Sequence, residues 1–196
     1  MLHSVFQKTL RDGLRALLWW GVSLAGLALM VAFFYPSVRD TPALNAFVKQ
    51  APEALIRAFA GEMADLTSPA GYLNSQLFYM VAPLLLLIYA IGSGSAAIAG
   101  EEERGTLEML LSNPVPRWRV VAEKAAATVI STVALGLTIW LGLALGMVYV
   151  DMGISLLRMA EATLSGVLLA VAFGMLALAV GCMRGERGLS VGMGAP

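Results

Sequence analysis

Four long apolar blocks without charged residues limit the folds open to this chain. They cover roughly residues 16–35, 72–100, 125–150 and 162–183, and none contains Asp, Glu, Lys or Arg. A stretch of about 20 apolar residues, rising about 1.5 Å per residue, matches the roughly 30 Å hydrocarbon core of a bilayer. The blocks therefore predict an all-α, polytopic membrane protein with about four transmembrane helices.

The overall composition agrees with this class. Charged residues make up 13% of the chain, about half of the roughly 25% found in soluble domains. The formal net charge is +0, so nothing indicates a nucleic-acid partner. A lone cysteine, Cys182, excludes an internal disulfide. The first block exceeds the 7–15 residues of a signal-peptide core, so we expect it to stay as a membrane anchor.

The segments that flank the first block predict helices at the membrane surface. Residues 3–15 are amphipathic and basic, which indicates either an interfacial helix or a simple basic flank. Pro36 is expected to end the first span. Residues 36–71 keep a helical rhythm of apolar residues and are expected to form a long external loop with one or two surface helices.

Proline and small residues predict how the spans bend and pack. Pro83 lies inside the second block and predicts a kink. Residues 92–97 contain only Gly, Ser and Ala, and such a surface favours close helix approach or lines a pathway. Gly142 and Gly146 form a G-x-x-x-G pair, which also favours close helix contact.

The distribution of Lys and Arg predicts the orientation. Three lie before the first span, four in residues 101–124 and two in the tail, against three in the external loop and one in the last short loop. The positive-inside rule therefore places the N-terminus and residues 101–124 in the cytoplasm. Residues 184–196 turn basic and then apolar, so we expect them to begin a further span.

The loop between the second and third spans predicts a short cytoplasmic helix. Thr106 can cap its start, and Glu108 lies near its positive end. Leu107, Leu110 and Leu111 share one face at i, i+3 and i+4. Such a helix either docks in a groove of a cytoplasmic partner or lies on the lipid headgroups. The third span would then begin with interface anchors, namely Arg117, Trp118, Arg119 and Lys124.

This loop resembles the cytoplasmic loop of type-2 ABC export permeases. In that family a pattern close to E-x-x-x-G-T-L-E-x-L-L-x-x-P-V-x-R, followed by a Lys, connects the second and third spans. The matching residues are Glu101, Gly105, Thr106, Leu107, Glu108, Leu110, Leu111, Pro114, Val115, Arg117 and Lys124. The order of elements is similar over essentially all 196 residues. The family normally has six spans, so the resemblance implies that this chain is truncated at its C-terminus.

The resemblance implies a single permease domain over residues 1–196, whose 101–124 loop carries a coupling helix. Its contacts with a separate ATP-binding subunit would come from Glu101, Gly105, Thr106, Leu107, Glu108, Leu110, Leu111, Pro114 and Arg117. Two permease subunits, identical or different, would line the path in a bacterial or archaeal inner membrane. The chain would bind no cofactor or metal, and ATP and Mg would lie on the partner. Consistently, the sequence contains no G-x-x-x-x-G-K-[ST] motif.

Other function classes receive less support from the residues. An ion-coupled carrier usually has ionisable residues inside its spans, whereas the four blocks have none and the only histidine is His3. A membrane enzyme needs paired acid–base groups, a nucleophile–base pair or metal ligands, and the cluster 101–103 has no His or Cys beside it. A scaffold protein stays open, with the coupling-type loop arguing against it. The sequence does not name a substrate.

Overall fold

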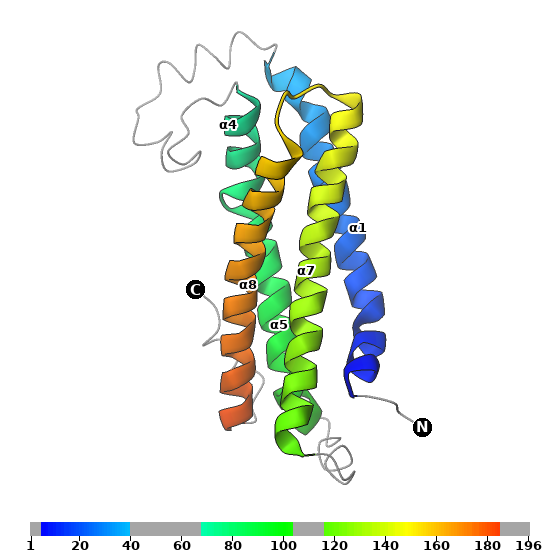
Figure 1. Ribbon diagram of the computed structural model, residues 1–196, viewed down its shortest axis with the longest axis vertical. Coiled ribbons are helices and arrows are strands. Elements are labelled where there is room, and N and C mark those ends of the chain that lie inside the picture. The colour runs from blue at the N-terminus through cyan, green and yellow to red at the C-terminus, as the bar shows by residue number, and fades with distance from the viewer. Residues whose placement is uncertain (1–4, 40–67, 104–115, 185–196) are drawn as a thin grey trace, which may run out of the picture. The chain divides into compact units, whose positions relative to one another are not determined.

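The computed structural model describes residues 5–39, 68–103 and 116–184, and every regular element in these ranges is helical (Figure 1). The elements are α1 (Val5–Arg39), α4 (Pro69–Leu73), the π-helix η1 (Asn74–Phe78), α5 (Val81–Glu103), α7 (Arg117–Tyr149) and α8 (Leu156–Arg184). Four stretches are long and apolar enough to cross a membrane, namely Phe6–Arg39, Pro69–Ile98, Trp118–Tyr149 and Leu156–Met183. The predicted all-α class with four spans is confirmed. Most of the external loop, the centre of the coupling loop and most of the tail lie outside the described residues.

Helix α1 joins the basic flank to the first span without a break. It begins at Val5 and continues through Pro36 to Arg39. The expectation that Pro36 ends the span is therefore wrong. Proline lacks the N–H that would bond the carbonyl of Ala32, but the residues after it still donate to later carbonyls, so the last turn continues. Residues 5–15 are the start of the same helix and not a separate element.

The second span is interrupted just before Pro83. In η1 the N–H of Tyr79 donates to the carbonyl of Asn74, 2.7 Å away, and α5 begins at Val81 after a two-residue turn. In a continuous α-helix the ring of Pro83 would meet the carbonyl four residues earlier, that of Tyr79. The irregularity predicted at Pro83 thus takes the form of a change from π- to α-helical winding.

The described helices belong to two compact units, to each of which α1, α5, α7 and α8 contribute residues. Unit 1 takes its described residues from Met1–Trp19, Leu85–Leu135 and Val167–Pro196. Unit 2 takes its described residues from Trp20–Leu84 and Gly136–Gly166.

In unit 1 the helices α5 and α8 approach closely through glycine. A Cβ atom on Gly94 would overlap the carbonyl oxygen of Gly174, and one on Gly174 would lie 3.1 Å from the Cβ of Ala90. Because Gly94 and Gly174 have no side chains, the two backbones can approach closely here. This agrees with the close helix approach predicted from the small residues at 92–97. A buried apolar cluster in the same unit consists of Leu87, Ile91 and Ala177.

In unit 2 the G-x-x-x-G pair of α7 packs against α1. A Cβ on Gly142 would lie 2.7 Å from the carbonyl oxygen of Ala25 and 3.0 Å from the Cβ of Ala28. A Cβ on Gly146 would overlap the Cβ of Ala32. The predicted close contact is confirmed, and its partner is a helix of the same chain.

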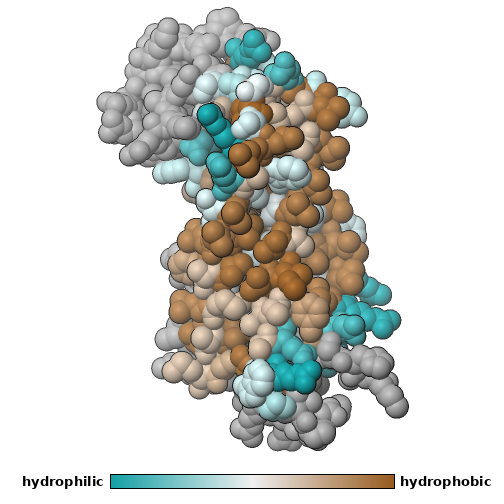
Figure 2. Space-filling view, in the orientation of Figure 1, coloured by the Kyte–Doolittle hydropathy of each residue, from teal (hydrophilic) through white to brown (hydrophobic). Residues whose placement is uncertain are grey.

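The outward faces of the long helices are apolar. Large exposed hydrophobic side chains include Trp19 on α1, Ile88 on α5, Leu137 on α7 and Leu168 on α8. Figure 2 shows hydrophobic residues over much of the face in view. Soluble proteins rarely expose contiguous apolar surface beyond a few hundred Å², so these faces fit contact with lipid chains.

Candidate functional site

The structure describes the two ends of the predicted coupling loop. Glu101 lies in the last turn of α5, and Arg117 is the first residue of α7. The other predicted contact residues lie outside the described residues; they are Gly105, Thr106, Leu107, Glu108, Leu110, Leu111 and Pro114. The coupling helix therefore stays a prediction, and the geometry available is that of the helices that carry it.

A buried lysine joins these two helices within unit 1. Lys124 lies two turns into α7, and its side chain is only 2% exposed. Its Nζ donates a hydrogen bond to the carbonyl oxygen of Ala97, which lies about two turns before the end of α5. A buried ammonium group is costly unless it is hydrogen-bonded. This contact therefore ties together the helix that enters the loop and the helix that leaves it.

A row of hydroxyl groups continues along the same side of α7. The Oγ1 of Thr128 lies 3.3 Å from the Oγ of Ser93 on α5, and it donates to the carbonyl of Lys124 at 3.2 Å. One turn further, Thr132 donates to the carbonyl of Thr128 at 2.8 Å. Buried polar side chains in the described residues all have partners. The α5–α7 contact in unit 1 is therefore polar and hydrogen-bonded, a common way to join helices in a membrane.

Glu123 joins the start of α1 to the same part of α7. Its Oε2 accepts a hydrogen bond from the backbone N–H of Phe6 at 2.9 Å, and its Oε1 accepts one from the Nε of Arg119 at 3.0 Å. The first N–H groups of a helix have no partner within the helix, and a carboxylate there also complements the helix dipole. The first turn of α1 is thus attached to the first turns of α7.

Of the predicted interface anchors, Lys124 proves to be placed differently. Trp118 is 72% exposed and Arg119 is also exposed, as expected of anchors. Lys124 is buried between helices, so the expectation that it anchors the span at the surface is wrong. The reason is its spacing: Lys124, Thr128 and Thr132 recur every four residues and share one face of α7. That periodicity is visible in the sequence and was the signal that could have found this polar row.

The described residues offer no metal site. In the ranges 5–39, 68–103 and 116–184, no three His, Cys, Asp or Glu side chains come together in a way that could hold an ion. The site is therefore built from backbone carbonyls, hydroxyls and two charged residues of α7, Glu123 and Lys124. Hydrogen bonds between such groups hold neighbouring helices together.

Comparison with known protein families gives one finding. A family model described as ABC-2 family transporter protein matches residues 3–188, which is nearly the whole chain. Neither the search of curated proteins nor that of solved structures found a match.

Proposed function

The chain belongs to the ABC-2 transporter family, and from this membership we propose that it is the permease subunit of an ATP-driven exporter. The family makes it a membrane component of an ABC transporter. The finer proposal is that ATP is hydrolysed on a separate subunit, which holds ATP and Mg. That subunit would engage the loop between α5 and α7, and a second permease subunit, identical or different, would complete the translocation path in the inner membrane.

The contacts around the loop support this proposal. Lys124 bonds the carbonyl of Ala97, and Glu123 bonds the N–H of Phe6. A force on the loop therefore acts on α5 and α7 together, and through Glu123 on the start of α1. Rigid transmission is what coupling requires, because packed helices shift as bodies and do not deform continuously. The family match over residues 3–188 is the single observation that carries the proposal, and the Lys124–Ala97 contact supports the coupling role of the loop.

The test replaces the apolar face of the predicted coupling helix. Burying one leucine is worth about 1.5–3 kcal/mol, and a small contact retains little net affinity after its ordering costs. We therefore expect Leu110→Asp with Leu111→Asp to abolish co-purification with the ATP-binding subunit and ATP-dependent export. Insertion should stay normal, because both residues lie outside the spans.

The matched control is Met109→Asp with Ser112→Asp, which adds the same two charges away from the leucine face. It should retain co-purification, and the amount of each variant in the membrane fraction should equal that of the wild type. Glu108→Ala should have a milder effect than the leucine variant, since a charge at a helix start is worth about 0.3–1 kcal/mol. Undiminished co-purification and export in the leucine variant would contradict the coupling role.

Buried Lys124 gives some support to a second candidate, an ion-coupled carrier. Among the described residues, Lys124 is the only charged residue that is buried. It lies in the membrane-spanning stretch Trp118–Tyr149. Ionisable groups inside spans often belong to ion pathways. Transport in sealed vesicles separates the two functions. The exporter needs ATP and the partner and continues after an ionophore collapses the ion gradients, whereas a carrier stops at that point.

A further inference from the structure

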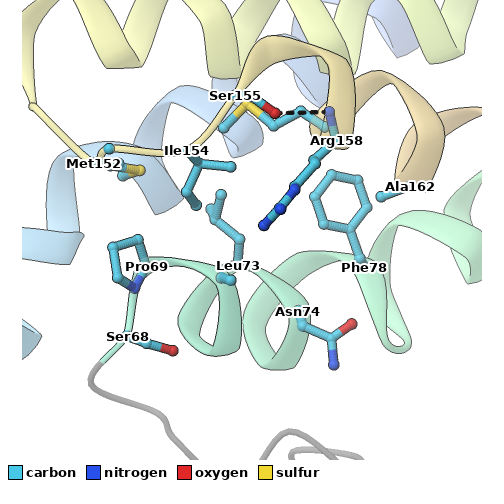
Figure 3. Close-up of a pocket in the computed structure, with 13 residues that line it drawn as sticks. Ser68, Pro69, Leu73, Asn74, Phe78, Met152, Ile154, Ser155, Arg158 and Ala162 are labelled. Atoms are coloured by element: carbon cyan, nitrogen blue, oxygen red, sulfur yellow. Dashed lines mark hydrogen bonds between the residues drawn. The ribbon is translucent and has the colours of Figure 1, made fainter.

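Unit 2 contains a cavity whose position along the chain is far from the coupling loop. It has a volume of about 590 Å³ and lies between α4 and η1 on one side and residues 152–155 and the start of α8 on the other (Figure 3). Small-molecule sites typically occupy about 300–1,000 Å³. Helix α7 ends at Tyr149, and the lining residues of the cavity resume at Met152, three residues later in the chain.

The described wall of the cavity is mostly apolar. Apolar lining residues include Leu73, Phe78, Met152, Ile154 and Met159. Met152 and Met159 are almost fully buried, at 3% and 2% exposure.

A tight turn positions this part of the wall. Gly153 adopts a φ of +63°, a conformation that side chains disfavour, and its N–H donates to the Oδ1 of Asp151 at 3.2 Å. Ser155 then accepts a hydrogen bond from the N–H of Arg158 at 3.3 Å as α8 begins. The turn thereby brings Met152 and Ile154 against the cavity.

One exposed cation, Arg158, is among the described residues that line this cavity. Figure 3 shows the side chain of Arg158 extending from α8 toward the gap between Leu73 and Phe78. No Asp or Glu is among the lining residues in the part of the chain that the structure describes. Among the described residues, the guanidinium group of Arg158 has no hydrogen-bond or ion-pair partner. An arginine offers five N–H donors in a fork that matches carboxylate and phosphate oxygens.

We propose that this cavity binds an anionic amphiphile, a molecule with a carboxylate or phosphate head for Arg158 and an apolar tail for the wall formed by Leu73, Phe78 and Met159. A neutral apolar ligand would form no ion pair with the exposed guanidinium group, and a hydrophilic anion would make no contact with the apolar wall. The occupant is either a lipid of the bilayer or a free amphiphile, and both share this chemistry. The proposal goes beyond the exporter function, because binding needs no ATP-binding subunit.

The experiment uses the full-length protein in nanodiscs of uncharged, zwitterionic lipid. The probe is dodecyl phosphate with a photoreactive diazirine in its tail, and labelled residues are mapped by mass spectrometry. We expect saturable labelling of segments 68–78 and 152–162. Arg158→Gln should weaken labelling at least tenfold, whereas Arg158→Lys should retain most of it, and Arg39→Gln, which removes a cation from the same unit outside the cavity, should have no effect.

Two further experiments test the role of the ligand's apolar tail and the source of the ligand. Ala162→Phe fills part of the cavity and should weaken labelling without removing the charge, and the cationic analogue with the same tail should label poorly. In nanodiscs of anionic lipid, competition with the probe identifies a bilayer lipid as occupant, whereas unchanged labelling identifies a free amphiphile. Equal labelling of wild type and Arg158→Gln, or equal labelling by the cationic analogue, would overturn the proposal. Either result leaves the exporter function untouched.

Discussion

At the scale of single residues, some helix contacts depend on whether a residue carries a Cβ atom. Gly94 and Gly92 lie two residues apart on α5, yet their surroundings differ completely. A Cβ on Gly94 would overlap the backbone of Gly174, whereas a Cβ on Gly92 would meet nothing within 4 Å. The overlapping atom is a backbone carbonyl, which cannot move aside like the tip of a side chain.

This pair provides a matched prediction. Gly94→Ala should lower the free energy of unfolding by about 1–3 kcal/mol, because overpacking forces the two backbones apart. Gly92→Ala should leave it unchanged or raise it by up to about 1 kcal/mol, because alanine favours helix over glycine. Both are measured by thermal unfolding in detergent, followed by circular dichroism. An equal effect of the two substitutions would contradict the close approach of α5 and α8.

At the scale of elements, the start of α1 depends on a residue that is distant in sequence. Glu123 on α7 accepts the N–H of Phe6, which is separated from it by 117 positions. A helix start normally finds its cap within a few residues of itself. In this chain the cap comes from the helix that follows the coupling loop, so the order of the first turns of α1 depends on α7.

Removing that cap should loosen the first turns of α1. Loss of a cap costs about 0.5–2 kcal/mol, so Glu123→Ala should speed amide hydrogen exchange in residues 6–10 by about 2- to 30-fold, at about 1.4 kcal/mol per tenfold change. Mass spectrometry of the N-terminal peptide gives the rate. Glu161→Ala, which removes an exposed carboxylate from α8, is the control and should leave these amides unchanged. Unaltered exchange in the Glu123 variant would show that Phe6 is held by other contacts.

At the scale of the whole molecule, the charge distribution predicts which ends of the spans face the cytoplasm. We expect an introduced cysteine at Ala51 to react with an impermeant thiol reagent in intact cells, and one at Ser112 to react only after permeabilisation. Both are made in a Cys182→Ser background, because the native thiol is exposed in the structure. Labelling of position 112 in intact cells would reverse the assigned orientation and, with it, the cytoplasmic position of the coupling loop.

Much of this architecture could be predicted from the residues, but its details could not. The four blocks predicted the spans, and Gly142 and Gly146 predicted a close helix contact, because length and residue size act locally. The end of α1 was misplaced because Pro36 falls in the last turn, where one missing hydrogen bond is tolerated. Lys124 was assigned to the membrane surface because an isolated lysine beside a span usually reaches the interface.

What the sequence alone determined is the set of membrane-spanning helices and the family-like loop between two of them. Backbone groups in lipid must be hydrogen-bonded, and an apolar block of about 20 residues or more satisfies them within itself as a helix. The tertiary structure alone decided which faces meet: α7 against α1 at Gly142, Lys124 against Ala97, and Arg158 beside Leu73 and Phe78 at the cavity. Lipid chains and neighbouring helices are equally apolar, so the hydrophobic pattern of a span does not reveal its inward face, and only contacts between distant residues do.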